Sequence, residues 1–150
     1  MVVGDHSAAQ ENWRQALNEL EPFLRDQPEN FTLIYDLAIT SMGLDDKTAA
    51  FSLVEKATAV DPIEKDAVDG PTPIEVLARV SAQMGEPDRA IASLQKVLSI
   101  LYEGPLAGGN LRLTPARLRL DPMFDPLRND PRFQKLAGSE APKDAASAAK

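Results

Sequence analysis

Apolar residues recur at helical spacing near the start of the chain. Between residues 7 and 30 they fall at intervals that place them on one side of an α-helix. The positions are Trp13, Ala16, Leu17, Leu20, Phe23 and Leu24. Ser7-Ala8-Ala9-Gln10 has the form of a capping box, so we expect the helix to begin there. Pro22 removes one backbone donor, and we expect a kink at that point.

The same spacing predicts an antiparallel pair of helices over residues 31–62. Gly43 is a candidate for a left-handed cap that ends the first helix. Asp45 or Asp46 is a candidate cap for the second helix, which Asp61-Pro62 ends. The turn between the two helices is short, so they form a hairpin. Its buried positions are Ile34, Leu37, Ala38, Ser41, Ala50, Val54 and Ala57.

A second hairpin follows a polar loop, which is predicted over residues 63–71 because the helical spacing is lost there. Thr72-Pro73-Ile74-Glu75 combines a capping box with proline at the first helical position. Gly85 ends that helix and Pro87 opens the next. The buried positions are Ile74, Leu77, Ala78, Ser81, Ala90, Leu94 and Val97. Residues 102–113, rich in Gly and Pro, are interpreted as another loop.

The two hairpins repeat one pattern. An offset of 40 residues aligns all seven buried positions without a gap. Small residues such as Ala38 and Ala50 stand where two helices must approach closely. Pro28 and Pro62, which are 34 residues apart, frame the first copy.

This pattern resembles the tetratricopeptide repeat (TPR) family, whose unit of about 34 residues has large, small and proline positions at these spacings. Residues 31–64 match best. Residues 71–104 have Tyr102 in place of the closing proline and follow six extra loop residues. Residues 7–30 fit as half a repeat whose partner helix is missing, so a truncated parent is expected. The resemblance implies an all-α fold of antiparallel helical hairpins, stacked as a short right-handed solenoid.

Three Asp-Pro pairs lie near the C-terminus, beginning at Asp121, Asp125 and Asp130. Each is a helix-start signal, with Asp as the cap and Pro as the first residue. The surrounding run resembles the segment that closes the C-terminal TPR region of many bacterial multidomain regulators and kinases. We expect residues 114–137 to cap the apolar end of the stack and residues 138–150 to be a disordered tail. The capping side chains would be Met123, Phe124, Leu127, Phe133 and Leu136.

Composition narrows the class of partner. The chain has 150 residues, enough for one domain, and its 16 basic and 23 acidic side chains give a net charge of −7. This charge repels nucleic acid and anionic membranes, so neither is expected as a partner. The absence of cysteine excludes disulfides and thiolate zinc sites. Because the sequence has neither a signal-peptide pattern nor a run of about 18 apolar residues, we expect a cytoplasmic location.

Candidate catalytic and metal-binding residues are few. His6 is the only histidine, so neither a nucleophile triad nor a typical zinc site can form. Asp45-Asp46 is interpreted as a helix cap rather than an acid–base pair. The acidic loop at residues 61–70 lacks the spacing of a calcium loop, and residues 107–110 lack the ending of a phosphate loop. We expect no enzymatic activity, no metal and no cofactor.

Charge is unevenly placed along the chain. Residues 1–110 hold 8 basic and 18 acidic side chains, whereas residues 111–150 hold 8 basic and 5 acidic ones. We therefore expect the C-terminal arginines to dock on the acidic hairpins rather than to contact nucleic acid. These are Arg112, Arg117, Arg119, Arg128 and Arg132.

The resemblance also implies a binding surface, because the first helix of each repeat in this family lines a concave face. In the first hairpin this face would comprise Thr32, Tyr35, Asp36, Ile39 and Met42. In the second it would comprise Thr72, Glu75, Val76, Arg79 and Gln83. Apolar residues off the buried stripe indicate a contact surface, and the alternative is burial under the C-terminal segment. The Lys and Asn pattern with which some family members grip a carboxylate is not repeated here.

Together these features predict a noncatalytic adaptor or regulatory region of a larger bacterial signalling protein. It would bind a protein or peptide partner, or other domains of its parent chain, on the concave face. The alternative is self-association, in which the unpaired helix of residues 7–30 finds its partner in another copy. An enzyme or small-molecule binder is a third hypothesis, for which the sequence offers no site.

Overall fold

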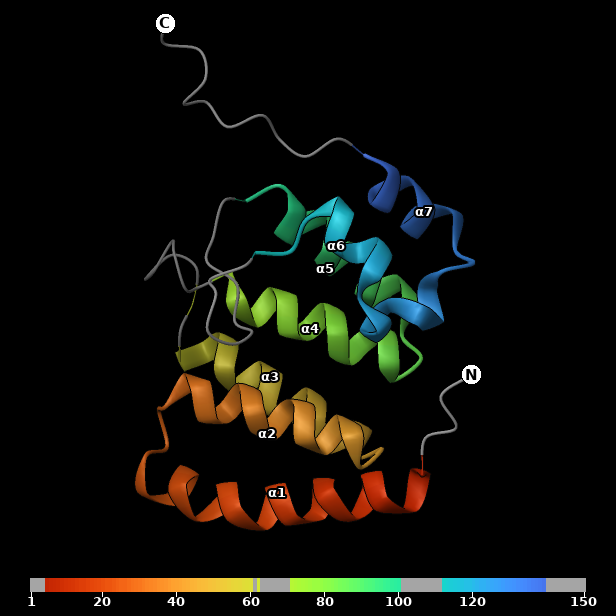
Figure 1. The fold of residues 1–150 in the computed structure, drawn as a ribbon. Coiled ribbons are helices and arrows are strands. Elements are labelled where there is room, and N and C mark those ends of the chain that lie inside the picture. The colour runs from red at the N-terminus through yellow and green to blue at the C-terminus, as the bar shows by residue number, and fades with distance from the viewer. Residues whose placement is uncertain (1–4, 61, 63–70, 101–111, 140–150) are drawn as a thin grey trace, which may run out of the picture.

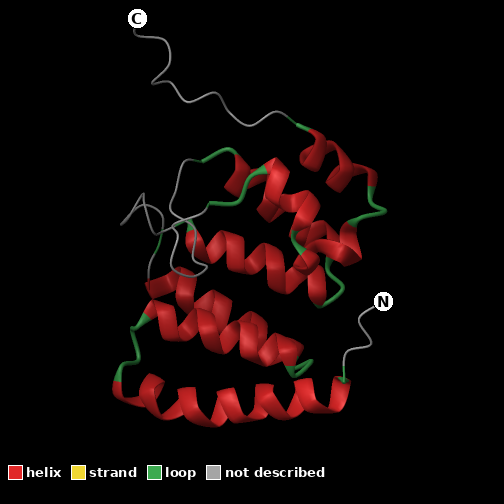
Figure 2. Ribbon diagram, in the orientation of Figure 1, coloured by secondary structure: helices red, strands yellow, loops and turns green. Residues whose placement is uncertain are grey.

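The computed structural model describes residues 5–60, 62, 71–100 and 112–139, and every regular element in these ranges is helical (Figures 1 and 2). The all-α class predicted from the sequence is confirmed for this part of the chain. The elements are α1 (His6–Asp26), α2 (Phe31–Gly43), α3 (Lys47–Val60), α4 (Thr72–Gln83), α5 (Pro87–Leu98), α6 (Pro115–Leu120), the 3₁₀ helix η1 (Pro122–Leu127) and α7 (Pro131–Gly138).

Helices α2 and α3 pack as one hairpin, and α4 and α5 pack as a second. Most of their predicted stripe positions are buried, and Ala38, Ala50, Ala78 and Ala90 are all 0% exposed. Ile74 and Leu77 are only half-buried at the edges of the core clusters. Small side chains at the alanine positions let the helix axes approach closely. Helix α4 also packs on α2 and α3, so the second hairpin stacks on the first, while α1 packs on α2 at the other end (Figure 1).

Two helix starts differ from the prediction. Asp5, not Ser7, caps α1, because its carboxylate accepts the amide of Ala8 at 3.1 Å. Gln10 is then free to donate its side-chain amide to the carbonyl of Gly43 at 2.9 Å, which joins α1 to α2. Thr72 lies inside α4, whose cap position is Pro71, with no side-chain hydrogen bond to the helix start.

The turn between α2 and α3 corrects the role expected of Gly43. Gly43 is the last residue of α2 and does not have positive φ; Asp45 has it instead, at 62°. A Cβ atom at Gly43 would lie 2.4 Å from the indole Cε2 of Trp13, so glycine is required for close packing of α1. Asp46 caps the start of α3, as predicted, by accepting the amide of Ala49 at 2.9 Å.

The C-terminal elements seal the second hairpin. Asp121 caps η1 and Asp130 caps α7, whereas the Asp125-Pro126 pair lies inside η1. Of the predicted capping side chains, Phe124, Leu127 and Phe133 are at most 2% exposed, whereas Met123 and Leu136 are half-buried. The three buried side chains share one cluster with residues of α4 and α5. Burying each such side chain contributes about 1.5–3 kcal/mol, so the cap is a permanent part of the core rather than a removable lid.

Candidate protein-interaction surfaces

The predicted contact residues of α2 divide between the core and the surface. Tyr35 and Met42 are 6% and 8% exposed and belong to one cluster with Val76 and Val80 of α4. They were expected on an open face because they lie off the main stripe, but α4 covers that side of α2. Ile39 is half-buried against the same cluster, and only Thr32 and Asp36 are exposed.

Most of the predicted contact residues of α4 are buried, and Arg79 and Gln83 contact the C-terminal segment. Thr72, Glu75 and Arg79 are buried, as is Val76, which packs toward the first hairpin. Gln83 remains exposed but donates its side-chain amide to the carbonyl of Met123 at 2.8 Å. Because η1 packs along α4, the alternative of burial under the C-terminal segment describes this face better than an open concave surface.

Arg79 is the centre of a buried charged network. Its guanidinium donates to Oε1 of Glu75 at 2.7 Å and 3.1 Å and to Oδ2 of Asp121 at 2.6 Å. The guanidinium carbon also lies 5.2 Å from the ring centroid of Phe124, which is within cation–π range. Burial by itself lowers the pKa of Arg79, but attraction from Glu75 and the hydrogen bonds to both carboxylates outweigh it, and the pKa is raised. This network fastens η1 to α4 and leaves Arg79 unavailable to a partner.

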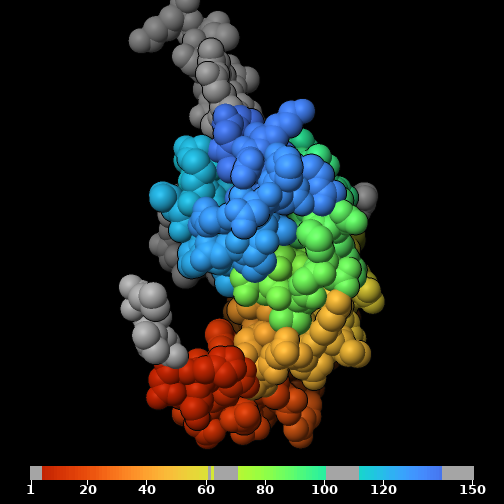
Figure 3. Space-filling view, turned by 90° about the vertical axis from the view of Figure 1, so that its right-hand side faces the viewer, coloured from red at the N-terminus to blue at the C-terminus, as the bar shows by residue number. Residues whose placement is uncertain are grey.

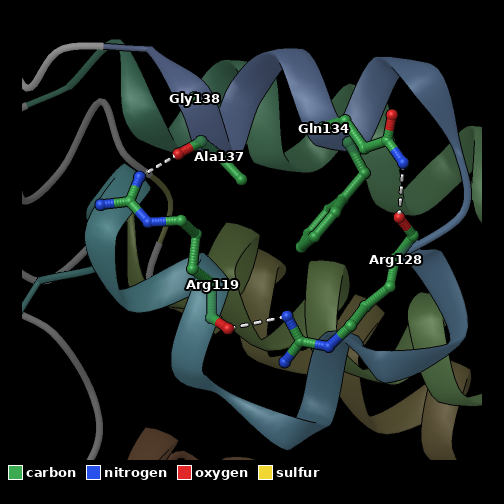
Figure 4. Close-up of a pocket in the computed structure, with 6 residues that line it drawn as sticks. Arg119, Arg128, Gln134, Ala137 and Gly138 are labelled. Atoms are coloured by element: carbon green, nitrogen blue, oxygen red, sulfur yellow. Dashed lines mark hydrogen bonds between the residues drawn. The ribbon is translucent and has the colours of Figure 1, made fainter.

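The C-terminal arginines dock mostly within the cap. Arg132 reaches the hairpins, where it pairs with Asp88 at 2.7 Å. Arg128 pairs with Asp125 at 2.6 Å and donates to the carbonyl of Arg119 at 2.7 Å, and Arg119 donates to the carbonyl of Ala137. These bonds surround a hollow of about 270 Å³ that Phe133 also lines (Figure 4). Because Arg119 and Arg128 donate their hydrogen bonds to backbone carbonyls, we assign these two side chains a structural role in the cap.

The most exposed packing surface belongs to α1. None of its residues, all of which the structure describes, is buried. We call Ala16, Leu20 and Phe23 the α1 strip. Ala16 and Leu20 are half-buried, and Phe23 is 55% exposed. The residues 34 positions later are Ala50, Val54 and Ala57, which are 0–1% exposed. The strip is thus the more exposed equivalent of a core surface, and α1, which carries it, lies at the end of the molecule opposite the cap (Figure 3).

A groove lies beside this strip, lined on α1 by Leu17, Glu21 and Leu24. It has a volume of about 310 Å³ and is formed where α1, α2 and α3 meet. Leucines make up half of its lining, and the polar lining residues are Glu21, Ser41, Asp46 and Ser52. The lining leucines are Leu17, Leu24, Leu37, Leu44 and Leu53.

His6 and Asp46, which the sequence offered as candidate catalytic residues, are both exposed. His6 is exposed at the first turn of α1, and Asp46 serves as a cap. Within the described ranges no three His, Cys, Asp or Glu side chains gather as metal ligands. The sequence analysis considered residues 61–70 as a calcium loop and residues 107–110 as a phosphate loop. Apart from Pro62, these residues lie outside the described ranges. No described helix has the length and apolar character needed to cross a membrane.

Comparisons with protein-family models, with curated proteins and with solved structures found no match for this chain. The structure itself shows two stacked helical hairpins, with α1 packed on α2 at one end and the C-terminal elements packed on the second hairpin at the other. Sequence reasoning identified the α1 strip as apolar. It missed Asp121 as the partner of Arg79, for which no local pattern exists, because the two residues are far apart in the chain.

Proposed function

We propose that this chain is a noncatalytic protein-interaction module, a short TPR-like solenoid that serves as an adaptor or regulatory region of a larger bacterial signalling protein. The TPR-like part of the proposal is supported by the repeat itself. Ala38 and Ala78 are equally buried, as are Ala50 and Ala90, and α4 packs on both helices of the first hairpin. Stacking of like units in which each contacts its neighbour is the arrangement of repeat proteins.

The α1 strip is the observation that carries the binding function. Phe23 is 55% exposed and lies next to the half-buried Leu20 on one side of α1, so the strip offers contiguous apolar surface that a partner can cover. Apolar side chains within a polar rim are the usual core of a protein interface. We therefore assign the partner-binding surface to the N-terminal helix α1. The concave face predicted from the sequence is the poorer candidate, because η1 covers α4 there.

A capture experiment tests this function. The full chain and its Phe23→Glu variant are used as bait in extract of the source cell, and bound proteins are identified by mass spectrometry. We expect at least one protein that wild type retains and Phe23→Glu loses. Leu120→Glu is the matched control, because Leu120 is 81% exposed at the capped end. If no captured protein distinguishes Phe23→Glu from Leu120→Glu, the proposed function fails at this surface.

Self-association is the second candidate, and the same strip favours it. Two copies could bury Leu20 and Phe23 against each other in an isologous contact. Sedimentation velocity over a range of concentrations tests this directly. A dimer that Phe23→Glu abolishes would support self-association. If the chain stays monomeric at high concentration, self-association is wrong and a different protein is the expected partner.

A further inference from the structure

The contact between Trp13 and Gly43 sets how α1 and α2 lie against each other. Asp36 and Ile39 precede Gly43 by seven and four residues, so they lie on the same side of α2. Ala16 and Leu20 follow Trp13 by three and seven residues on α1. The chain turns back between the two helices (Figure 1), so the α1 strip runs beside Thr32, Asp36 and Ile39, which we call the α2 row. Together they form the two sides of one elongated site.

The shape of the occupant follows from the repeat. On α3, the residues equivalent to the α1 strip are Ala50, Val54 and Ala57, and α2 packs against that helix as its hairpin partner. The element that fits along the α1 strip is therefore an α-helix laid alongside α1, as α2 lies alongside α3. A helix needs an apolar residue at every third or fourth position to make this contact.

The chemistry of the occupant follows from the α2 row. Val76 and Val80 of α4 pack on the preceding hairpin and are 2% and 0% exposed. Their equivalents on α2 are Asp36 and Thr40. An occupant that meets the α2 row thus faces a carboxylate where the internal repeat has a valine, and a cationic side chain satisfies that carboxylate best.

Charges on α1 point the same way. Glu19 and Asp26 each follow a residue of the α1 strip by three positions, so they border it. Arg14 and Arg25 are two positions from Ala16 and Phe23 and lie on the opposite side of the helix. Helix α2 contains no lysine or arginine. Among the described residues of these two helices, the charged side chains that border the site are all acidic.

We propose that the α1 strip and the α2 row bind a basic amphipathic helix of a partner protein. Its apolar stripe packs on Leu20 and Phe23, and lysine or arginine on its flanks meets Glu19 and Asp36. This inference rests on the protein-interaction function proposed above and specifies its partner. A second copy of this chain is the poorer fit, because it brings a net charge of −7 to an acidic site.

A designed peptide tests the chemistry directly. The probe is an 18-residue capped helix of leucine and alanine along one stripe with lysine on both flanks, and its control carries glutamate at every lysine position. The full ¹⁵N-labelled chain is titrated with each peptide. We expect saturable shifts that centre on Ala16, Leu20, Phe23 and Asp36 for the lysine peptide only, weakening as salt is raised.

Two variants with matched controls separate the apolar and charged contributions. We expect Phe23→Ser to weaken binding of the lysine peptide about tenfold or more, and Asp36→Lys to weaken it several-fold. Leu120→Ser and Glu55→Lys are the controls, since both residues are exposed and lie on α6 and α3, away from this site. Neither should change the affinity, and circular dichroism verifies that all four variants are folded.

Several results would overturn the inference: no saturable binding, equal binding of the glutamate peptide, or shifts centred on the hollow beside Arg119 and Arg128. A concentration-dependent dimer that Phe23→Ser dissociates would assign the site to a second copy instead. If the lysine peptide fails but a cellular protein is still captured through Phe23, the interaction function stands and only the basic-helix chemistry is wrong. If both fail, the function itself is wrong.

Discussion

Arg79 and Asp121 are 42 residues apart in the chain, and the guanidinium of Arg79 donates a hydrogen bond of 2.6 Å to the carboxylate of Asp121. The side chains of Arg79 and Glu75 are each 1% exposed, and that of Asp121 is 16% exposed. Removing one partner from an ion pair this deeply buried destabilises the protein, because water cannot solvate the charge that remains. The C-terminal cap is therefore attached by a buried ionic contact as well as by its aromatic core.

Removing the guanidinium should destabilise the protein strongly. We expect Arg79→Met to lower the free energy of unfolding by about 3–5 kcal/mol, because it removes the buried cation that Glu75 and Asp121 share. Adding Glu75→Leu to Arg79→Met should restore most of the loss. Urea denaturation at pH 7 measures both. Lys47→Met is the control, since its exposed pair with Glu86 should contribute at most about 1 kcal/mol. Equal effects of Arg79→Met and Lys47→Met would contradict the prediction.

Gly43→Ala tests the close contact of α1 with α2. Alanine is the better helix former by about 1 kcal/mol, so without Trp13 the substitution would stabilise α2. A Cβ at this position would instead lie 2.4 Å from the indole ring, and we expect a net loss of about 1–3 kcal/mol. Trp13 is the only tryptophan, so its emission should shift to the red as the ring moves into water.

Gly138→Ala is the matched control for that prediction. A Cβ at Gly138 would meet no atom within 4 Å, so alanine should leave both stability and Trp13 emission nearly unchanged. Higher stability of Gly43→Ala with unaltered emission would show that Trp13 does not press on this glycine.

The buried stripes of the two hairpins were predictable because their signal is local. Ala38, Ala50 and Val54 repeat at helical spacing, and a short turn already brings the two helices together. The open surface was not predictable in the same way. Tyr35 and Met42 have the composition of a contact surface, and only the position of α4 decides that they are core. Gly43 carried an ambiguous signal, since glycine serves both helix ends and close packing.

Distant contacts explain the remaining errors. Arg79 was predicted to face solvent on the concave surface, because no residue near it in the sequence indicates a contact with Asp121. The Asp-Pro pairs gave correct helix starts at Asp121 and Asp130, because capping is a local interaction. Which face the resulting segment covers depends on the whole stack.

Acid should weaken the attachment of α7. The Arg132 side chain donates to Asp130, and this hydrogen bond is the main reason that the pKa of Asp130 is lowered to about 2. Because the folded-state pKa lies below the unfolded value of about 3.9, the stabilising contribution is complete above about pH 4. It is lost as the pH falls through about 2. The urea midpoint of wild type should thus exceed that of Asp130→Asn at pH 7, and the difference should shrink between pH 4 and pH 2. A difference independent of pH would contradict this.

Asp36 should show the opposite dependence on pH. Partial burial raises the pKa of the Asp36 carboxyl above its ordinary value, so protonation favours the folded state and stability is lost as the pH rises through the folded-state pKa. We expect Asp36→Asn to be more stable than wild type at pH 7, within the range of about 0.5 kcal/mol typical of surface substitutions. The gain should vanish near pH 3, where both side chains are neutral. Urea denaturation at the two pH values measures it. If Asp36→Asn is instead less stable at pH 7, the ionised carboxylate has a stabilising partner in the folded chain, and the α2 row does not present an unsatisfied acid to a basic helix.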